Sequence, residues 1–600
     1  MERELIPELH DCLKLTTLQH NFADFDRFLK YVPDTRSWAG VIQHHCQEEF
    51  PAFPADRDTF LLHMADSTAS NFSRHRQSYK GENAFVLHKI WNPHGVKEDL
   101  RLKSDNEIIK LLKFYSKDST FEDLIREYSH ILKSRAEDAR PGKNITSLLT
   151  HLTLTGKFYR FFKNSQVLTV DDTELIPELG KMHLLTISKS NKWQIYLMLC
   201  KLNFSQQPFR ARDLNIFELL EDTMNVIAER FRDNILFAGS DELLIFYDEL
   251  SVFEEIKDIA LKNGFWLSTV WVKKALSEMK IADPASLTGN KAENIFSSSL
   301  PERIEPPLCE ICQMAHGGMT WPRDYLSQFG SNEDIETQGT DHLCENCFSI
   351  RSKPSRLRKL KHWTDYGADV IWLRVGLDYK KLTSALEQLY FEYLQQLNPK
   401  ASMDEAQVRF SLVHEFQQDY NYFLNALKGK LINVFSSDNV ETLLRDMFCI
   451  KAESKADVFA VLELLNNLLK LSFPELLKKL DNPMKASLSF CYSKHPFFEI
   501  WREIKEQTSD MQINLVGKGS IKTTYKYIDD MLLAKTENYR KSALYNLAEI
   551  AKISEKLAEI KFNDRSEKND FYSYEALKRH LLPIGMDFRS ILTFVKLLEG

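Results

Sequence analysis

The sequence predicts a multidomain α+β protein, and three observations lead to that prediction. The chain has 600 residues, which is too long for one hydrophobic core and corresponds to roughly four units of about 150 residues each. With 43% hydrophobic and 27% charged residues, its composition is that of a globular protein. The spacing of the apolar residues also changes along the chain, from a helical period at both ends to alternating strand and helix signals between them.

Residues 1–166 and 527–600 have the apolar spacing of helices. In the first region, aromatic residues and leucines recur every three or four positions, as in HNFADFDRFLKYV and TFEDLIREYSHILKS. The second region keeps this spacing as far as the C-terminus. We therefore expect a helical domain at each end of the chain.

Between these ends, one order of elements occurs twice. In residues 167–282, QIYLMLCKL predicts a strand, LNIFELLEDTMNVIAERF a helix, and NILFAGSDELLIFYD a hairpin around a Gly-Ser-Asp turn. In residues 363–526, ADVIWLRVGLD, SALEQLYFEYLQQL and KLINVFSSDNVETLL repeat this order, and KASLSFCYS predicts a further strand. The chain therefore contains a diverged internal duplication.

Two CxxC pairs lie in the insert that separates the two copies, residues 283–362. CEIC and CENC place two pairs of thiolates on short turns, and a tetrahedral Zn²⁺ needs four such ligands. The alternative, four unrelated buried thiols, does not explain the paired spacing. Because four thiolates leave no open coordination position, we predict a structural zinc ion. Its ligands would be Cys309, Cys312, Cys344 and Cys347.

The first helical region also contains histidines and carboxylates that can ligate a divalent metal. His10 and Asp11 are adjacent, and a carboxylate in such a pair can hold ions that activate water for phosphodiester hydrolysis. On the residues alone, capping or surface histidines are the alternative interpretation. The further candidates in this region are His44, His45, Asp66 and His151.

Each predicted hairpin has only part of a nucleotide and metal site. A nucleotidyl-transferring site holds Mg²⁺ with carboxylates on a strand and on a neighbouring hairpin. The first turn has Asp241 and Glu242, but its partner strand has a lysine and an asparagine where an acid is needed. We place the second turn at residues 436–439, with Asp438 in the turn and Asp378 on the partner strand. We expect impaired two-metal catalysis at both, so each is either a solvated turn or a residual nucleotide site.

The order of these features resembles the large subunit of type III CRISPR effector complexes over essentially the full length of the chain. The matching pieces are LHDCLKL, an HH pair followed by HMADSTAS, SLLTHLTLTG, the two CxxC pairs, SSDNVETLL and SLSFCYSKHPFFEIW. The resemblance implies a permuted HD domain at 1–166 and ferredoxin-like palm domains at 167–282 and 363–526. It also implies a helical C-terminal domain at 527–600.

The resemblance further implies an activity and a set of partners. The HD domain would cut single-stranded DNA with Mn²⁺, Mg²⁺ or a similar ion, and the second palm, with Ser-Ser-Asp-Asn in place of Gly-Gly-Asp-Asp, would be an inactive cyclic-oligoadenylate cyclase. The expected partners are guide RNA, target RNA, and backbone and small subunits of the complex. Two alternatives stay open: a non-catalytic scaffold of the same ribonucleoprotein, and a first palm that still binds ATP near Asp241 and Glu242. The residues matching the HD metal ligands are His10, Asp11, His44, His45, Asp66 and His151.

Charge and hydropathy restrict where the protein acts. The net charge of −7 argues against coating of nucleic acid by the whole surface, so an RNA contact must be local. The basic residues 351–362 are either such a contact or a solvated charged face. We find no apolar run long enough to cross a bilayer. The N-terminus has acidic residues where a secretory signal needs basic ones. Of the nine cysteines, four form the metal site and five are scattered, which suits a reducing cytosol better than a disulfide framework. We therefore expect a cytoplasmic protein that does not enter membranes.

Overall fold

The structure is a computed structural model, and the helices and strands it describes are distributed along the whole chain. No helix among the described residues is long and apolar enough to span a membrane. The described residues are 7–16, 28, 31, 57–73, 89–92, 95–98, 100–116, 120–135, 146–165, 194–204, 206, 211–275, 293–295, 306–313, 315, 317–322, 340–353, 357–397, 399–400, 402–403, 409–477, 482–505, 507, 509–535, 541–567, 581–582 and 586–598.

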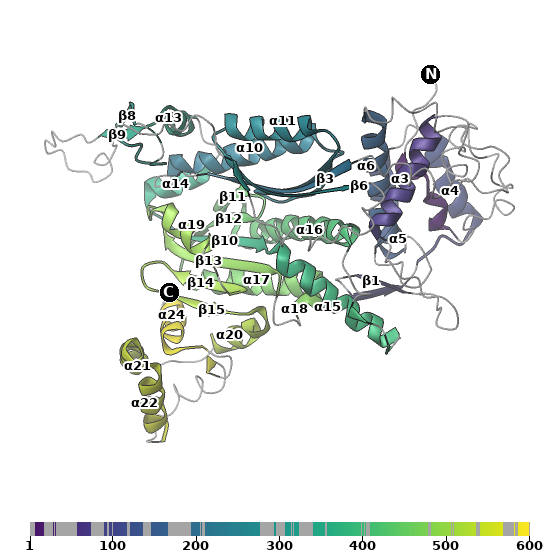
Figure 1. The fold of residues 1–600 in the computed structure, drawn as a ribbon. Coiled ribbons are helices and arrows are strands. Elements are labelled where there is room, and N and C mark those ends of the chain that lie inside the picture. The colour runs from purple at the N-terminus through teal and green to yellow at the C-terminus, as the bar shows by residue number, and fades with distance from the viewer. Residues whose placement is uncertain are drawn as a thin grey trace.

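The N-terminal part is a packed group of helices, at one end of the molecule in Figure 1. Helix α6 is buried along most of its length and contacts α3, α5 and the short 3-10 helix η1. A capping box formed by Thr120 and Asp123 begins α5. The elements are η1 (Pro7–Leu9), η2 (Cys12–Leu15), α3 (Arg57–Ser73), β1 (Lys89–Asn92), β2 (Gly95–Glu98), α4 (Asp105–Ser116), α5 (Phe121–Ser134) and α6 (Leu148–Asn164).

The first α/β unit contains a sheet with the strand order β4-β5-β3-β6-β7. The hairpin β4-β5 pairs with one edge of β3, and β6 pairs with the other edge, all antiparallel. Helices α10 and α11 cover one face of this sheet (Figure 1). The β-α-β-β-α-β order is that of a ferredoxin-like unit. The elements are β3 (Gln194–Asn203), η8 (Ala211–Leu214), α10 (Asn215–Arg230), β4 (Ile235–Ala238), β5 (Glu242–Tyr247), α11 (Leu250–Lys262), β6 (Trp266–Ala275) and β7 (Glu293–Ile295).

The second α/β unit repeats this topology and extends it. Its sheet has the order β11-β12-β10-β13-β14-β15, in which a hairpin and β13 flank the first strand, β10. Strand β14 is parallel to β13, and β15 is antiparallel to β14. The repeated order of elements in the sequence is therefore present in the fold. The elements are β10 (Asp369–Leu377), α15 (Tyr379–Leu397), α16 (Phe410–Phe435), η11 (Ser437–Asn439), β11 (Val440–Leu444), β12 (Met447–Ala452), α17 (Asp457–Ser472), α18 (Pro474–Leu477), β13 (Met484–Tyr492), α19 (Phe497–Lys505), β14 (Met511–Leu515) and β15 (Gly519–Thr523).

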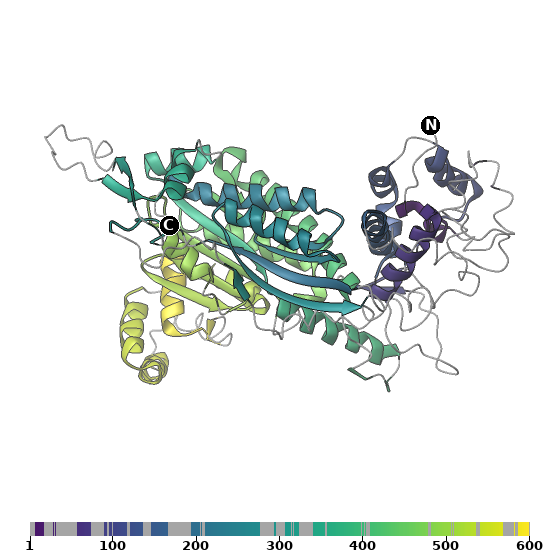
Figure 2. The same cartoon turned by 45° about the horizontal axis from the view of Figure 1, so that its top comes forward.

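Two smaller parts complete the described chain. The cysteine-containing insert lies at the end of the first unit that is remote from the N-terminal helices, as both views show (Figures 1 and 2). Helices follow β15, and α24 packs on that edge strand. The elements are β8 (Met319–Pro322), β9 (Thr340–Leu343), α13 (Glu345–Ser352), α14 (Arg358–Tyr366), η12 (Tyr525–Tyr527), α20 (Ile528–Ala534), α21 (Lys541–Ile553), α22 (Glu555–Glu567) and α24 (Phe588–Leu598).

Two hydrophobic cores each contain residues from both α/β units. The central strands β3 and β10 contribute to both cores, because alternate residues of a strand point to opposite faces of the sheet. On β3, Leu197 belongs to the core that includes the N-terminal helices, and Met198 belongs to the core that contains α10 and α19. On β10, Leu373 and Trp372 divide in the same way. Helix α16 lies between the two sheets in Figure 1 and contacts β4, β11 and β12.

The turn of the second hairpin is not where the sequence prediction places it. Helix α16 runs without a break into this segment, and residues 437–439 form the 3-10 helix η11 ahead of β11. The hairpin turn consists of Arg445 and Asp446, because Leu444 pairs with Met447. The prediction of a hairpin turn at 436–439 is therefore wrong. The preceding apolar run, KLINVF, belongs to a helix and not to a strand.

Candidate metal centres and the junction of the two hairpins

Four side chains from distant parts of the sequence converge in the N-terminal helices. His10 and Asp11 follow η1, Asp66 lies on α3, and His151 lies in the first turn of α6. One ligand atom from each lies within 4.8 Å of the other three. His151 Nε2 is 3.1 Å from Asp66 Oδ1 and 3.3 Å from Asp11 Oδ2. His10 Nε2 is 3.6 Å and 3.5 Å from the same two oxygens.

A backbone hydrogen bond determines which nitrogen of His10 faces the carboxylates. His10 Nδ1 lies 2.7 Å from the carbonyl oxygen of Pro7. Because a carbonyl oxygen only accepts, Nδ1 carries the proton, and Nε2 of the neutral ring keeps its lone pair. This lone pair points toward the Asp11 and Asp66 oxygens. Metal-ligating histidines are commonly oriented in this way by a hydrogen bond at the other ring nitrogen.

The electrostatic environment keeps the Asp66 carboxylate ionised. Burial tends to raise the pKa of Asp66, but the adjacent His10 and His151 imidazoles hold it well below its usual range. Lys14 Nζ donates a hydrogen bond to Asp11 Oδ2, which compensates part of the negative charge. Two imidazole nitrogens and two carboxylates are a donor set that suits a divalent first-row transition metal, so these residues fit such an ion.

The segment that carries His10 is fastened to α6. Glu8 is buried, and its Oε1 accepts a hydrogen bond from Arg160 Nη1 at 2.5 Å. Arg160 Nε in turn donates to Asp233 Oδ1, also at 2.5 Å, in the loop that leads into β4. Gly156 of α6 faces Glu8 so closely that a Cβ atom would overlap its carboxyl group. The glycine therefore leaves room for the Glu8 side chain against α6.

The structure brings together four of the six residues predicted for this centre: His10, Asp11, Asp66 and His151. The other two, His44 and His45, lie outside the described residues. Lys14 was not predicted. Its signal was available, because residues three apart on a helical turn lie on the same side, and Lys14 is three residues after Asp11.

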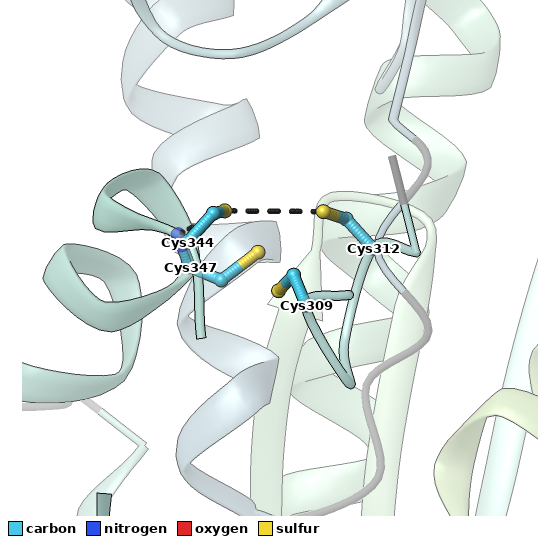
Figure 3. Close-up of side chains that lie close together, drawn as sticks. All are labelled: Cys309, Cys312, Cys344 and Cys347. Carbon is cyan, nitrogen blue, oxygen red and sulfur yellow. Dashed lines mark hydrogen bonds between the residues drawn. The ribbon is translucent and has the colours of Figure 1, made fainter. Parts of the chain in front are cut away.

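The four predicted zinc ligands also converge (Figure 3). Their sulfur atoms all lie within 4.8 Å of one another. Cys312 Sγ and Cys344 Sγ are 3.8 Å apart, close to the separation of about 3.8 Å expected for a tetrahedron with Zn–S bonds of about 2.3 Å. Hydrogen bonds within the cluster, first from Cys312, lower the pKa of the Cys309 thiol, while those with Cys309 raise that of Cys347. The cluster fits a structural zinc ion.

A buried arginine holds the cysteine module against the first α/β unit. Arg351 of α13 donates to both carboxylate oxygens of Asp213 in η8, at 2.6 and 3.0 Å. It also donates to Asp341 of β9 at 2.6 Å. Cys344 is the N-cap of α13, and its sulfur accepts a hydrogen bond from the Cys347 backbone. Helix α13 thus links two zinc ligands to the neighbouring unit.

The tips of the two hairpins meet each other. Ser240 Oγ of the first hairpin donates to Asp446 Oδ1 of the second at 2.7 Å. Arg374 on β10 lies between the two turns, with Nε 3.4 Å from Asp446 Oδ2 and Nη2 3.9 Å from Asp241 Oδ1. The acid at the second tip is therefore Asp446, which the sequence analysis did not identify. Its signal was a pair of polar residues between two apolar runs, VETLL and MFCIKA.

Lys201 on β3 occupies the position in the first sheet that Arg374 occupies in the second. Its Nζ lies 3.4 Å from Asp241 Oδ2 and 3.1 Å from Glu242 Oε1. Burial alone would lower the pKa of Lys201, but these two carboxylates raise it on balance. Each central strand thus points a basic side chain at the carboxylates of the hairpins.

Basic side chains share the junction of the hairpins with its carboxylates. Three carboxylates meet there, those of Asp241, Glu242 and Asp446, and the chain itself supplies two positive charges to them. Mg²⁺ ions at the same oxygens would have to compete with the ammonium and guanidinium groups, whereas the phosphates of a nucleotide would be attracted by them. The nucleotide-binding role of Asp241 and Glu242 stays a prediction.

The other two acids predicted for the second palm lie away from its hairpin turn. Asp378 follows β10, accepts a hydrogen bond from the Lys381 backbone at the start of α15, and pairs with Lys485 at 3.2 Å. Asp438 is exposed in η11, at the opposite end of β11 from the turn. The structure does not bring either residue to Asp446.

Comparisons with known proteins give structural neighbours only. No protein-family model matches the sequence, and neither does any curated protein sequence. Csm1 of T. onnurineus superposes with a TM-score of 0.48 at 10% identity, over 99% of this chain and 98% of that chain. The Csm1-Csm4 cassette in complex with pppApA gives a TM-score of 0.48 at 11% identity, and the cassette with AMPPNP gives 0.47 at 11%. Each match covers 99% of this chain and 99% of the matched chain. At TM-scores below 0.5 and such low identity, the likeness does not establish a function for this chain.

Proposed function

We propose that this chain is the large subunit of a type III CRISPR effector complex and that its His/Asp cluster is a metal-dependent nuclease centre for single-stranded DNA. The observation that carries the proposal is the convergence of His10, Asp11, Asp66 and His151 from three separate segments. Chance His-Asp dipeptides do not gather two more ligands from helices more than 50 and 130 residues away in the sequence. The order of motifs along the chain supports the family assignment.

The residues of the cluster have separate roles in this proposal. A divalent ion bound there supplies a Lewis acid and a water molecule of lowered pKa for attack on a phosphodiester. His10 and His151 would hold such an ion through their Nε2 atoms, and the hydrogen bond to Pro7 keeps His10 in the tautomer that this requires. Asp11 and Asp66 provide the negative charge that retains it. Lys14, next to Asp11, is placed to attract the phosphate of an incoming strand.

The domain assignments follow from this identity. Residues 1–166 would be the HD domain, 167–282 and 363–526 the two palms, 283–362 the zinc module, and 527–600 the C-terminal helical domain. Guide RNA, target RNA and the other subunits of the complex would be its partners. The cyclase would be inactive, because Lys201 and Arg374 hold the hairpin carboxylates in ion pairs.

The test is a cleavage assay on the assembled complex with Mn²⁺, guide RNA, target RNA and single-stranded DNA. The wild type should cut the DNA, and His10→Ala/Asp11→Ala should not. The variant Asp438→Asn is the control, since Asp438 is exposed and remote from the cluster, and it should retain activity. Equal cleavage by wild type and the double variant would exclude the nuclease centre. If the assembled wild-type complex does not cut the DNA, the non-catalytic scaffold is the remaining interpretation.

A further inference from the structure

Helix α16 presents two faces to two different parts of the molecule. One face carries polar residues four apart, and each contacts a different N-terminal helix. Ser411 Oγ donates to the Phe72 carbonyl in α3 at 3.0 Å. Glu415 accepts hydrogen bonds at the start of α6. Asp419 pairs with Lys133 of α5 at 3.2 Å.

The other face of α16 is hydrogen-bonded to the backbone of both sheets. His414 Nδ1 lies 2.5 Å from the Leu236 carbonyl oxygen, and Gln417 Nε2 donates to the Ala238 carbonyl oxygen at 3.2 Å, both in the first hairpin. Tyr420 donates its hydroxyl to the Val375 carbonyl oxygen of β10. One continuous helix therefore connects the helices of the His/Asp cluster with the strands of the hairpin junction.

Glu415 is the contact on α16 that lies nearest to a cluster ligand in the chain. Its Oε2 accepts a hydrogen bond from the Ser147 backbone at 2.8 Å and from the Thr150 hydroxyl at 3.1 Å, and both bonds are buried. Ser147 is the N-cap of α6. A carboxylate at this place satisfies N-terminal donors of the helix and is favoured by the helix dipole.

His151 belongs to the same helical turn. It follows Thr150 directly, and its backbone donates to the Ser147 carbonyl oxygen at 3.2 Å. Ser147, Thr150 and His151 are all buried. If the first turn of α6 frays or shifts, the imidazole moves relative to Asp11 and Asp66, which come from other segments.

We infer that Glu415 is a positioning residue of the metal centre, acting through Ser147 and Thr150 on His151, and that the N-terminal helices therefore form a complete metal site only when α16 is docked on them. This inference rests on the proposed function of the His/Asp cluster. Glu415 touches neither the ion nor the substrate.

The test is a Mn²⁺ titration of the full-length chain, followed by electron paramagnetic resonance of the free ion. Loss of a residue that orients a ligand from outside the coordination sphere weakens metal binding by about 10- to 100-fold, and we expect this for Glu415→Ala. Glu415→Gln keeps an oxygen that can accept both hydrogen bonds, so it should restore most of the affinity. Asp419→Asn is the matched control, because it changes the same face of α16 one turn later, at a contact with α5. The Mn²⁺ affinity of Asp419→Asn should equal that of the wild type.

A double-mutant cycle tests the route through Thr150. Thr150→Val removes the hydroxyl that donates to Glu415 and should weaken Mn²⁺ binding less than Glu415→Ala does. Because Thr150 and Glu415 share one hydrogen bond, the double variant should lose less Mn²⁺ affinity than the two single losses added together. Fully additive losses would contradict the route through Thr150. The melting temperature of each variant reports whether it is folded.

The outcomes separate this inference from the proposed function. A wild-type chain that takes up no Mn²⁺ at the cluster would contradict the nuclease proposal itself. A wild type that binds, with Glu415→Ala and Thr150→Val binding equally well, would overturn the positioning role of Glu415. If Glu415→Ala does not fold, Thr150→Val provides the test. An unchanged Mn²⁺ affinity of Thr150→Val would then overturn the positioning role of Glu415.

Discussion

At the scale of single residues, Gly156 decides how closely the His10 segment approaches α6. A helix gains about 1 kcal/mol when an interior glycine becomes alanine, but overpacking a buried site costs about 1–3 kcal/mol. Because a Cβ at position 156 would overlap the Glu8 side chain, which Arg160 holds in place, we expect the second effect to dominate. Gly156→Ala should lower the melting temperature and weaken Mn²⁺ binding.

Gly429 is the matched control for this substitution. It also lies within a helix, α16, and a Cβ there meets no atom within 4 Å. Gly429→Ala should therefore raise the free energy of unfolding by about 0.5–1 kcal/mol. If both variants were stabilised alike, the close approach of Glu8 to α6 would not be a constraint in solution.

His414 should make stability depend on pH. Burial lowers its pKa from 6.5 to about 4, with Lys157 acting in the same direction. Since the unfolded chain binds this proton more tightly, the stabilisation is complete above pH 6.5 and is lost as the pH falls toward 4. For the wild type, this residue should lower the free energy of unfolding by about 2 kcal/mol between pH 7 and pH 5.

Melting curves at several pH values would measure this effect. His414→Gln, which cannot titrate, should show a smaller decrease below pH 6.5 than the wild type. His130→Gln is the control, because His130 is exposed on α5, and its curves should follow the wild type. Identical pH dependence of the wild type and His414→Gln would contradict the buried, neutral state of His414.

The sequence predicts ligands better than the residues that support them. His10, Asp11 and the four cysteines have residue types and spacings that only a few chemistries explain. Glu415 and Arg374 carry no such signal, because any glutamate or arginine on a helix or strand is normally solvated. Their roles depend on contacts between segments that lie 72 to 268 residues apart, which no local pattern encodes.

At the scale of elements, Arg374 joins the two hairpins. Removing one partner of a buried ion pair leaves a charge uncompensated and costs about 3–5 kcal/mol. Arg374→Met should therefore destabilise the protein strongly, since Asp446 and Asp241 lose their neighbour. Adding Asp446→Asn should recover part of the loss, as measured by urea denaturation.

The exposed arginine of the same turn provides the comparison. Arg445→Met makes an identical chemical change at the hairpin tip but removes no buried charge. Its stability should stay near that of the wild type. A similar loss for Arg374→Met and Arg445→Met would mean that the junction is not held by its ion pairs.

The cysteine module should depend on its metal. We expect one zinc ion per chain by elemental analysis and none in Cys347→Ser, because three thiolates bind Zn²⁺ much less tightly than four. Limited proteolysis should then cut the variant within residues 283–362. Cys491→Ser, which changes a buried cysteine outside the cluster, should retain its zinc. Zinc retained by Cys347→Ser would contradict the four-thiolate site.

The elements that sequence patterns predicted well are those with one clear period. The strand at QIYLMLCKL and the helix after it lie where the alternation and spacing place them. The second hairpin was placed wrongly because KLINVF is the end of a 26-residue helix. A short apolar run fits a strand or a buried helix equally well when its neighbours are not considered.

At the scale of the whole molecule, the fold joins three regions through α16. The N-terminal helices hold the candidate metal site, the two sheets meet at a junction of ion pairs, and α16 is hydrogen-bonded to all of them. Sequence analysis predicted the repeated order of strands and helices that the two sheets share. It could not predict how they pack, because each contact is specified jointly by residues from different domains.

The central claim is that His10, Asp11, Asp66 and His151 hold a divalent ion, and crystals of the protein soaked in Mn²⁺ test it most directly. An anomalous difference map should contain a peak within bonding distance of His10 Nε2, His151 Nε2 and the two carboxylates. The peak should disappear in crystals of Asp66→Asn, while the zinc peak at the four cysteines remains. A map with no Mn²⁺ at the cluster, or with Mn²⁺ between Asp241 and Asp446 instead, would contradict the account.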